Sequence, residues 1–503
     1  SSPIIIHHRA DTLRFALKYT PQTMKHTKIV ATISDQRCEV DFIRSLYEAG
    51  MNVVRLNTAH MNEEGLHRVV SNVRMVSGRI GILIDTKGPE IRTTPCAAPI
   101  EFRTGDRVIM QGRPDGETTH ECICVSYPDF VKDLSADSDI LIDDGDLELK
   151  VIEKQAEQLI CEVQNNATLG SRKSVNVPGV RINLPSLTEK DRRNIEWAVA
   201  NRLDFIAHSF VRSKEDVLDV QEILDAHKSP IKIIAKIENQ EGVDNIDEIL
   251  KATYGVMVAR GDLGIEVPAE KIPGIQRMLI RKCVEAKKPV IVATQMLHSM
   301  INNPRPTRAE VTDIANAIYY RTDALMLSGE TAYGKYPLEA VQMMARVAYE
   351  TEQTKLLAND IRVPIKGDDL DVTSFLAKQA VKSSSKLGVR AIISDSYSGR
   401  TARYLAAFRG EATVFAICYR PEVMRMLSLS FGIWAVFQPW QVSRREYYHD
   451  ALKQLIDRQL ITEEDKVAYL SGSFGEGGGT TFLEINDVKR VLRAKDEYQL
   501  PTF

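Results

Sequence analysis

The sequence predicts an α/β fold in three parts: a (β/α)8 barrel, a small β-barrel-like domain inserted into it, and a doubly wound α/β domain at the C-terminal end. Three observations predict it. Short apolar runs recur with helix-like stretches between them, one interval is filled instead with short strand-like pieces, and an alternating strand–helix pattern restarts near residue 355. Short apolar runs of this kind are typical of strands buried on both faces of a parallel sheet.

Length and charge agree with this division and exclude several classes of protein. At ~150 residues per domain, 503 residues correspond to about three domains. The 65 Lys and Arg residues nearly balance the 68 Asp and Glu residues, for a net charge of -3, and 44% of the chain is hydrophobic. This composition argues against disorder and against a nucleic-acid partner. No apolar run approaches the ~18 residues that a membrane span needs, so no membrane partner is expected either.

The cysteines and the N-terminal segment bear on the cellular compartment. The seven cysteines are odd in number and scattered without a CxxC pair, which favours a reducing, cytoplasmic location over a disulfide framework or a zinc knuckle. The opening segment lacks the long apolar core of a signal peptide. Because Met24 begins a run that resembles a natural start, residues 1–23 are expected to be an N-terminal extension without a function of their own.

Eight apolar runs with helical stretches between most of them predict the barrel. The helical stretches carry start and stop signals, such as Gly50 at the end of the stretch 41–50. We therefore expect a (β/α)8, or TIM, barrel formed by residues 24–93 and 176–354. Its strands are expected at 28–33, 52–57, 82–86, 204–210, 232–238, 255–262, 289–295 and 324–330.

The interval after the third strand departs from the helical pattern. Residues 94–175 contain short strand-like pieces and turns, with two β-branched-rich stretches around the turn Asp143-Asp144-Gly145. They predict a small all-β domain inserted into the barrel. At the catalytic face such a domain would act as a lid that excludes water when closed, although an inert decoration would give the same pattern.

Residues 355–503 predict a separate doubly wound domain. Strand-like runs at 390–395, 412–417, 434–437 and 467–472 alternate with helical stretches. The loop 394–402 leads from a strand into a helix with hydroxyl side chains and Gly399, the layout of a phosphate-binding helix start, and the glycine-rich loop 471–481 is able to close over such a ligand. An ordinary pair of turns is the alternative, since most glycine-rich segments are turns.

Polar residues gather where the predicted barrel strands end, and the carboxyl ends of barrel strands face the active site. Residues two apart on a strand point the same way, so Lys236 and Glu238 are expected to project together. The same reasoning pairs Arg260 with Asp262. The alternative is that strands end in polar residues wherever the chain leaves the core. It explains one or two of these strand ends but not the whole set. Its members are Arg55, Asn57, Asp85, Thr86, Ser209, Lys236, Glu238, Arg260, Asp262, Thr294, Gln295, Ser328 and Glu330.

Two of these carboxylates predict a metal site. Glu238 and Asp262 end consecutive strands, which lie ~4.8 Å apart in a sheet, so both can share one hard cation such as Mg²⁺ or Mn²⁺. The cations Lys236, Arg55 and Arg92 nearby require an anion to complete the site. Enzymes that transfer phosphoryl groups typically use a metal ion together with several cationic side chains. Taken singly, each residue is equally compatible with a structural ion pair.

Long motifs throughout the barrel closely resemble those of the pyruvate kinase family. They are IDTKGPEIRT (84–93), KIENQEG (236–242), MVARGDLGIEVPAEKI (257–272), ATQMLHSM (293–300), NNPRPTRAEVTDIANAI (302–318) and LMLSGETAYGKYP (325–337). The resemblance is strong over about residues 25–350 and weaker in the C-terminal domain. It implies transfer of phosphate from phosphoenolpyruvate to ADP, giving pyruvate and ATP in the last step of glycolysis. It also implies a homotetramer.

The resemblance implies a role for each matching residue. Lys236 resembles the lysine that neutralises the phosphoryl group in flight, and Thr294 the hydroxyl linked to protonation of the enolate. The backbone at Ala259, Arg260 and Gly261 resembles the segment that holds the substrate carboxylate. The residues resembling phosphate-binding arginines are Arg55 and Arg92, and those resembling Mg²⁺ ligands are Glu238 and Asp262.

Further matches concern the nucleotide, a monovalent cation and an effector. Asn57, Asp85 and Thr86 match K⁺ ligands, Glu90 matches a glutamate of K⁺-dependent members, and Asp144 matches a lid aspartate. The expected nucleotide-binding residues are Asn57, His60, Arg92 and Lys173. A phosphorylated allosteric effector is expected at Ser396, Ser398, Arg400 and Thr401, with help from the loop 473–481.

Three positions depart from the pattern of the family. NTAHM (57–61) replaces NFSHG, so Ala59 lacks a hydroxyl ligand for K⁺. TISD (32–35) replaces TIGP, so Asp35 stands where a proline abuts the adenine. AHSF (207–210) replaces FASF and is expected to place His208 beside the substrate pocket, more as a satisfied core histidine than as a new acid.

Two other functions are compatible with parts of the pattern. A metal-dependent aldolase acting on pyruvate or phosphoenolpyruvate also needs a Glu/Asp metal pair and an enolate, but requires neither the lid nor Lys236. A non-catalytic sugar-phosphate sensor would account for the departures at Ala59, Asp35 and His208.

Overall fold

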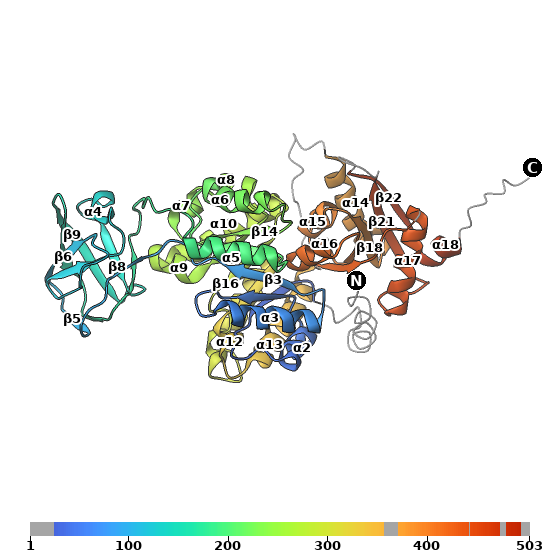
Figure 1. Cartoon of the computed structure of the whole chain (residues 1–503). Helices are drawn as coiled ribbons and strands as arrows, with labels where there is room; N and C mark the ends of the chain where they lie inside the picture. The colour runs from blue at the N-terminus through green and yellow to red at the C-terminus, as the bar shows by residue number, and fades with distance from the viewer. Residues whose placement is uncertain (1–24, 357–370, 442, 473–478, 494–503) are drawn as a thin grey trace, which may run out of the picture. The chain divides into compact units, whose positions relative to one another are not determined.

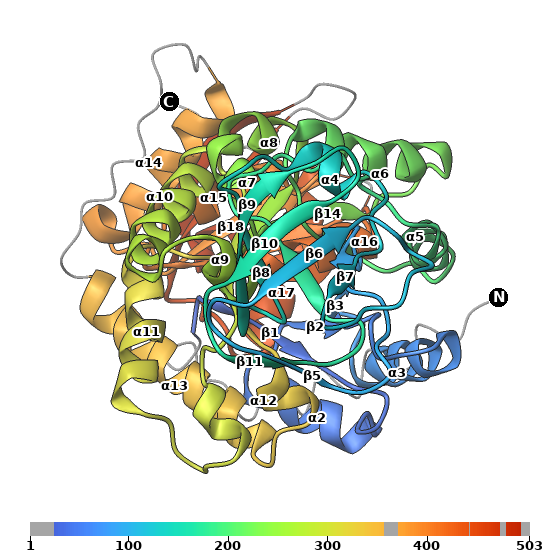
Figure 2. The ribbon, with the colours of Figure 1, turned by 90° about the vertical axis from the view of Figure 1, so that its left-hand side faces the viewer.

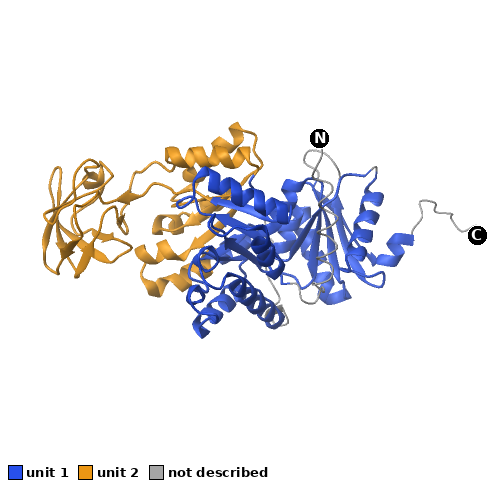
Figure 3. Cartoon of the chain, turned by 60° about the horizontal axis from the view of Figure 1, so that its bottom comes forward, with its two compact units in different colours: residues 1–84, 203–205, 280–503 blue, residues 85–202, 206–279 orange. Residues whose placement is uncertain are grey.

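The computed structural model in Figure 1 describes residues 25–356, 371–441, 443–472 and 479–493. The expected extension 1–23 and residues 473–478 of the glycine-rich loop lie outside the described residues. The chain divides into two compact units, residues 1–84, 203–205 and 280–503 in one and residues 85–202 and 206–279 in the other (Figure 3). None of the helices in the described ranges combines the length and apolar character needed to cross a membrane.

Eight parallel strands form a closed barrel in the order β1-β17-β16-β15-β14-β13-β3-β2, which confirms the predicted TIM barrel. All their residues are buried except Arg55 and Lys232, which are half-buried, and this burial explains the nearly continuous apolar runs. The strands are β1 (Lys28–Thr32), β2 (Val53–Leu56), β3 (Gly81–Asp85), β13 (Phe205–His208), β14 (Lys232–Ile237), β15 (Gly255–Ala259), β16 (Val290–Ala293) and β17 (Ala324–Leu327).

Every barrel strand ends before its predicted last residue, and two of them end three residues early. β15 stops at Ala259, and α9 (Arg260–Glu266) begins at the next residue. β17 stops at Leu327 before α12 (Gly329–Ala332). The prediction that Arg260 and Asp262 point the same way along a strand is therefore wrong, because successive side chains on a helix do not alternate between two faces. Asp262 instead lies in the first turn of a helix.

Side-chain caps begin several of the helices that alternate with the strands. Asn62 caps α3 by accepting from the amide of Gly65, and Thr188 and Thr307 form capping boxes at α5 and α11. Gly50, at a φ of 125°, ends α2. The helices are α2 (Val40–Ala49), α3 (Glu63–Val76), α5 (Glu189–Ala200), α6 (Lys214–Ala226), α7 (Gln240–Asp244), α8 (Ile246–Ala252), α10 (Ile272–Glu285), α11 (Arg308–Tyr319) and α13 (Pro337–Leu356), with short turns η2 (Ala269–Lys271) and η3 (His298–Ile301).

The inserted segment folds around its own apolar core, in which Phe102, Phe130 and Leu149 are almost fully buried. Its main sheet has seven strands in the order β4-β12-β8-β9-β10-β6-β7, and β11 pairs with β5 in a second sheet. Figure 2 shows β8, β9, β10 and β6 side by side. The elements are β4 (Ile91–Arg92), β5 (Ile100–Phe102), β6 (Arg107–Gln111), β7 (Cys122–Cys124), α4 (Phe130–Asp133), β8 (Asp139–Ile142), β9 (Leu147–Lys154), β10 (Leu159–Val163), β11 (Ala167–Leu169) and β12 (Ser174–Asn176).

The C-terminal part is an α/β domain built on a five-stranded sheet in the order β20-β19-β18-β21-β22. The four predicted strands are parallel, and β22 joins antiparallel to β21 as an edge strand that was not predicted, because its residues are mostly half-buried and give little apolar signal. The elements are α14 (Val372–Leu387), β18 (Ala391–Ser396), α15 (Arg400–Ala407), β19 (Thr413–Cys418), α16 (Pro421–Met426), η4 (Leu427–Leu429), β20 (Ile433–Phe437), α17 (Arg444–Asp457), β21 (Lys466–Gly472), β22 (Thr480–Asp487) and α18 (Val488–Arg493).

Candidate functional site

Lys236 lies at the centre of a buried polar cluster formed by the carboxyl ends of β3, β13 and β14. Its Nζ is 3.3 Å from Asp85 Oδ2, 3.3 Å from Glu238 Oε1 and 3.1 Å from Ser209 Oγ. The Lys236 side chain is 11% exposed, and those of Asp85 and Glu238 are nearly inaccessible. The prediction that Lys236 and Glu238 project together is confirmed. A buried ammonium held between two carboxylates is a rigid, positively charged feature of the site.

Glu238 and Asp262 come together as a pair of acidic side chains. Glu238 accepts a hydrogen bond from the Phe210 amide at 2.6 Å, which orients its carboxylate. Burial and, after it, the negative charge of Glu238 raise the pKa of Asp262, although the charge of Lys236 opposes this. A divalent cation would relieve the repulsion between the two carboxylates, so the donor set fits such an ion. In the ranges that the structure describes, no group of three or more His, Cys, Asp and Glu side chains has the geometry of a metal site.

A chain of hydrogen bonds connects Lys236 through Ser209 and Thr86 to His208. The Ser209 amide donates to Thr86 Oγ1 at 2.9 Å, and the Ser209 hydroxyl donates to the Thr86 carbonyl at 2.6 Å. His208 Nδ1 lies 3.0 Å from Thr86 Oγ1. Burial lowers the pKa of His208 to about 4, so its imidazole is uncharged near neutral pH. His208 is fully buried and is not among the residues that line the cavity described next, so its place relative to the bound substrate stays a prediction.

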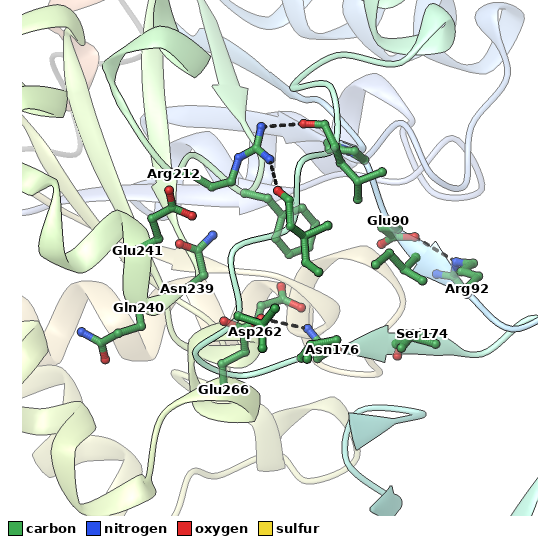
Figure 4. Close-up of a pocket in the computed structure, with 18 of the residues that line it drawn as sticks. Glu90, Arg92, Ser174, Asn176, Arg212, Asn239, Gln240, Glu241, Asp262 and Glu266 are labelled. Carbon is green, nitrogen blue, oxygen red and sulfur yellow. Dashed lines mark hydrogen bonds and ion pairs between the residues drawn. The ribbon is translucent and has the colours of Figure 1, made fainter. Parts of the chain in front are cut away.

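A cavity of about 680 Å³ opens beside the acidic pair. It is lined by residues of the inserted domain and of the barrel segments in the same unit (Figure 4). The Arg92 guanidinium pairs there with Glu90 at 2.9 Å and donates to the Arg172 carbonyl, and Lys173 lies 3.7 Å from Asp143. The predicted residues on its wall are Glu90, Arg92, Asp144, Lys173 and Asp262. The cavity wall therefore carries both cationic side chains and Asp262 of the acidic pair.

Glu266, Asn176 and Phe210 are among the cavity residues that the sequence interpretation did not single out. Glu266 lies on its wall, and burial raises the pKa of this carboxyl to about 7. Its Oε1 is 3.5 Å from the amide nitrogen of Asn176, a contact drawn in Figure 4. Phe210 also lines the cavity, at a φ of 57°. Glu266 stands inside the quoted motif GDLGIEV, so its place in that motif was an available signal, whereas Asn176 and Phe210 carried none.

Four further predicted site residues belong to the first unit and are described separately: Arg55, Asn57, His60 and Thr294. Arg55 donates to Thr32 Oγ1 at 3.2 Å, and Asn57 accepts from the amide of Ala59 at 3.1 Å. His60 is exposed. Thr294 follows β16 at a φ of 80°, and Gln295 continues at 56°. A β-branched residue rarely adopts such a conformation, and strain of this kind clusters at functional sites.

Asp35, one of the departures from the family pattern, has a structural partner. Its Oδ2 lies 3.7 Å from the guanidinium of Arg68, and its side chain is 13% exposed. The carboxylate is therefore held against α3. This pairing accounts for a charged residue at a position where the family has proline.

The residues expected to bind an effector surround the start of α15. The Arg400 guanidinium pairs with Asp371 and donates to the Tyr404 hydroxyl at 3.2 Å. The Thr401 and Thr480 hydroxyls lie 2.6 Å apart, and Ser398 Oγ accepts from the Arg400 amide at 3.4 Å. The Ser396 hydroxyl is buried and has no hydrogen-bond partner among the described residues. The predicted strand-to-helix turn is present, with Gly399 at a φ of 81°.

Comparison with known proteins finds relatives that match most of the chain. Residues 24–341 match the family model described as the barrel domain of pyruvate kinase, and residues 375–486 match its alpha/beta domain. The chain is 46% identical over 476 residues to a pyruvate kinase of Borreliella burgdorferi, covering 94% of this chain and 99% of that one. It is 43% identical to a pyruvate kinase of Bacillus licheniformis, covering 93% of this chain and 81% of that one. The crystal structure of a pyruvate kinase from Cryptosporidium parvum superposes with a TM-score of 0.87 at 35% identity, covering 93% and 97% of the two chains.

Proposed function

The chain belongs to the pyruvate kinase family, whose members transfer the phosphoryl group of phosphoenolpyruvate to ADP, and we propose how its own residues carry out that transfer. The observation that carries the proposal is the buried Lys236 ammonium, held by Asp85, Ser209 and Glu238. A fixed cation stabilises negative charge that develops on a phosphoryl group in flight, without reorganisation during the reaction. Membership of this family decides against the aldolase alternative.

The acidic pair would hold the divalent cation. Glu238 and Asp262 are the proposed ligands of Mg²⁺ or Mn²⁺, which when bound would supply positive charge to the oxygens of the substrate. For K⁺ we propose Asn57, Asp85 and Thr86. Support for the last two comes from the buried carboxylate of Asp85 next to the Thr86 carbonyl, both hard oxygen donors. Ala59 supplies no side-chain oxygen, so K⁺ would be held with one protein ligand fewer than is usual in the family.

The substrate is proposed to contact residues at the carboxyl ends of several barrel strands. Arg55 would bind phosphate, since its planar fork meets two oxygens at once. The turn at Ala259, Arg260 and Gly261, where β15 passes into α9, would hold the substrate carboxylate. Thr294 is proposed to act in protonation of the enolate, which its strained backbone supports.

The nucleotide is proposed to bind Asn57, His60, Arg92 and Lys173. Arg92 and Lys173 line the cavity and bring positive charge to it, which supports a place for the phosphates of ADP. Asp144 lies on the same wall and comes from the inserted domain. We propose that this domain acts as a lid over the reaction.

We also propose domain boundaries, a regulatory role for the C-terminal domain, an oligomeric state and a cellular location. The domains are placed at 24–93 with 176–354, at 94–175, and at 355–503, after the extension 1–23. The C-terminal domain is proposed to be regulatory, with an allosteric phosphorylated effector at Ser396, Ser398, Arg400 and Thr401. A homotetramer in the cytoplasm is expected from the family.

Replacement of the central lysine tests the proposed mechanism. Lys236→Met should lower kcat by several powers of ten in an assay coupled to pyruvate formation, because the variant loses charge stabilisation made mainly in the transition state. Its melting temperature should also fall, because Asp85 and Glu238 lose their cation, so kcat is measured well below that temperature, where the variant is folded. Lys232→Met is the matched control, since Lys232 starts the same strand β14 and contacts the Tyr254 ring instead of the cluster. Turnover near that of the parent in Lys236→Met would overturn the assigned role.

A further inference from the structure

His208 is a buried polar side chain that the proposed mechanism does not use. It is the last residue of β13 and is 0% exposed. Its Nε2 is buried and has no hydrogen-bond partner among the described residues, while Nδ1 meets Thr86. An unpartnered buried nitrogen costs free energy, so packing alone would favour an apolar residue here. The hydrogen bond from Thr86 is therefore the interaction, among the described residues, through which this ring can contribute to function.

The hydrogen bonds between Lys236 and Thr86 have defined directions. The Ser209 hydroxyl donates its only proton to the Thr86 carbonyl, so its oxygen is left to accept from the Lys236 ammonium. The Ser209 amide donates to Thr86 Oγ1. Thr86 thus holds both the backbone and the hydroxyl of Ser209, and Ser209 in turn holds the ammonium.

His208 completes this series of hydrogen bonds. Thr86 Oγ1 already accepts from Ser209, and among the residues that the structure describes its own proton has one acceptor, His208 Nδ1 at 3.0 Å. The ring is therefore assigned as the tautomer that carries its proton on Nε2. In that form the imidazole fixes the rotation of the Thr86 hydroxyl and keeps it directed away from Ser209.

We propose that His208 is a positioning residue for Lys236, acting through Thr86 and Ser209. The inference rests on the proposed function, since Lys236 is the group whose placement matters. His208 is not among the residues that line the cavity, and its printed hydrogen bond goes to Thr86, so we assign its effect on catalysis to that bond. Without the acceptor, the Thr86 hydroxyl is free to turn, and the Ser209 amide loses the fixed orientation of its acceptor, while the bond from the Ser209 hydroxyl to the Thr86 carbonyl remains.

Two substitutions separate positioning from packing. His208→Leu keeps most of the volume but removes the acceptor, and we expect kcat to fall roughly tenfold with an unchanged or higher melting temperature. His208→Asn leaves a small cavity but places an amide oxygen near the position of Nδ1, so we expect a lower melting temperature with kcat within about twofold of the parent. A purely structural histidine predicts the opposite, because kcat would then follow stability in both variants.

The measurements are kcat and KM for phosphoenolpyruvate and ADP, with melting temperatures, for both variants. His26→Leu is the matched control: His26 is another buried histidine with an unpartnered ring nitrogen, and it packs on Phe431 instead of Thr86. Its kcat should equal that of the parent. Parent-like kcat in His208→Leu, or an equal loss in His208→Asn, would overturn the proposal. Lys236→Met tests the proposed function independently, so a normal His208→Leu beside an inactive Lys236→Met would reject the positioning role alone.

Discussion

The guanidinium of Arg409 lies 2.8 Å from the carboxylate of Asp323, and the two side chains are 1% and 4% exposed. Arg409 follows α15 of the C-terminal domain, whereas Asp323 precedes the barrel strand β17. Asp323 also accepts from the amides of Val290 and Phe431, each at 3.0 Å. One buried carboxylate thus ties two barrel strands to the C-terminal domain.

Breaking this pair should destabilise the protein. Arg409→Met leaves the Asp323 carboxylate buried without its cation, and we expect a loss of ~3–5 kcal/mol in the free energy of unfolding, because an uncompensated buried charge is costly. Denaturant titration followed by circular dichroism measures it. The control is Arg107→Met, since the Arg107–Glu162 pair is 59% and 36% exposed and should contribute less than ~1 kcal/mol. Equal midpoints for the two variants would contradict the prediction.

Neutralising Glu238 should weaken the binding of a divalent cation. Glu238→Gln keeps an oxygen that can accept from Phe210 but removes one of two charges from the acidic pair. We expect the dissociation constant for Mn²⁺ to rise at least about tenfold, since hard cations depend on ligand charge. Titration of the substrate-free protein with Mn²⁺, read by electron paramagnetic resonance, measures it. Glu241→Gln removes the charge of a cavity residue that pairs with Arg181 at 3.3 Å, and it should leave the dissociation constant for Mn²⁺ unchanged.

The raised pKa of Glu266 should make stability depend on pH. Burial moves this pKa from 4.5 to about 7, so between these values the folded protein holds a proton that the unfolded chain has lost. Stability therefore falls as pH rises from about 4.5 to 7. Glu266→Gln removes the titrating group, and its melting temperature relative to the parent should increase across this interval. Scans in EDTA keep cation binding out of the measurement, and the exposed Glu270→Gln should run parallel to the parent.

A hydroxyl introduced at residue 59 should increase the apparent affinity for K⁺. The rate of the parent should rise when K⁺ replaces tetramethylammonium, and Ala59→Ser should lower the K⁺ concentration for half-activation about fivefold, the equivalent of one added ligand worth ~1 kcal/mol. The coupled assay over a K⁺ series measures both. A parent indifferent to K⁺ would contradict the assignment of Asn57, Asp85 and Thr86 and the inference from Glu90.

The ion pair at the start of α15 should compete with a phosphorylated effector. Asp371 occupies the Arg400 guanidinium, so Asp371→Asn should raise the affinity for a sugar phosphate or nucleoside monophosphate several-fold, while Arg400→Gln should abolish binding. Isothermal titration with a hexose bisphosphate and a nucleoside monophosphate distinguishes the two ligand classes. A dissociation constant that is the same in the parent and in both variants would show that the effector binds elsewhere.

Local pattern predicted much of the fold because each barrel strand is short, apolar and buried along its whole length. The two largest errors at strand ends, at 255–262 and 324–330, arose where a helix begins directly after the strand, so that polar residues of the helix extended the apparent run. The missed strand β22 has half-buried residues, and its place depends on pairing with β21, which no local signal reports.

The sequence by itself determined the order of strands and helices, the insertion, the family and the list of residues at the strand ends, because periodicity and motif spacing are properties of neighbouring residues. The tertiary structure decided which of them meet. Lys236 and Asp85 are 151 residues apart in the sequence, and the strand order β14-β13-β3 brings them within 3.3 Å. It also decided that His208 is fully buried against Thr86, that Asp262 is on a helix, and that Glu266 is buried enough to raise its pKa. The reason is that burial and long-range hydrogen bonds depend on neighbours from distant parts of the chain.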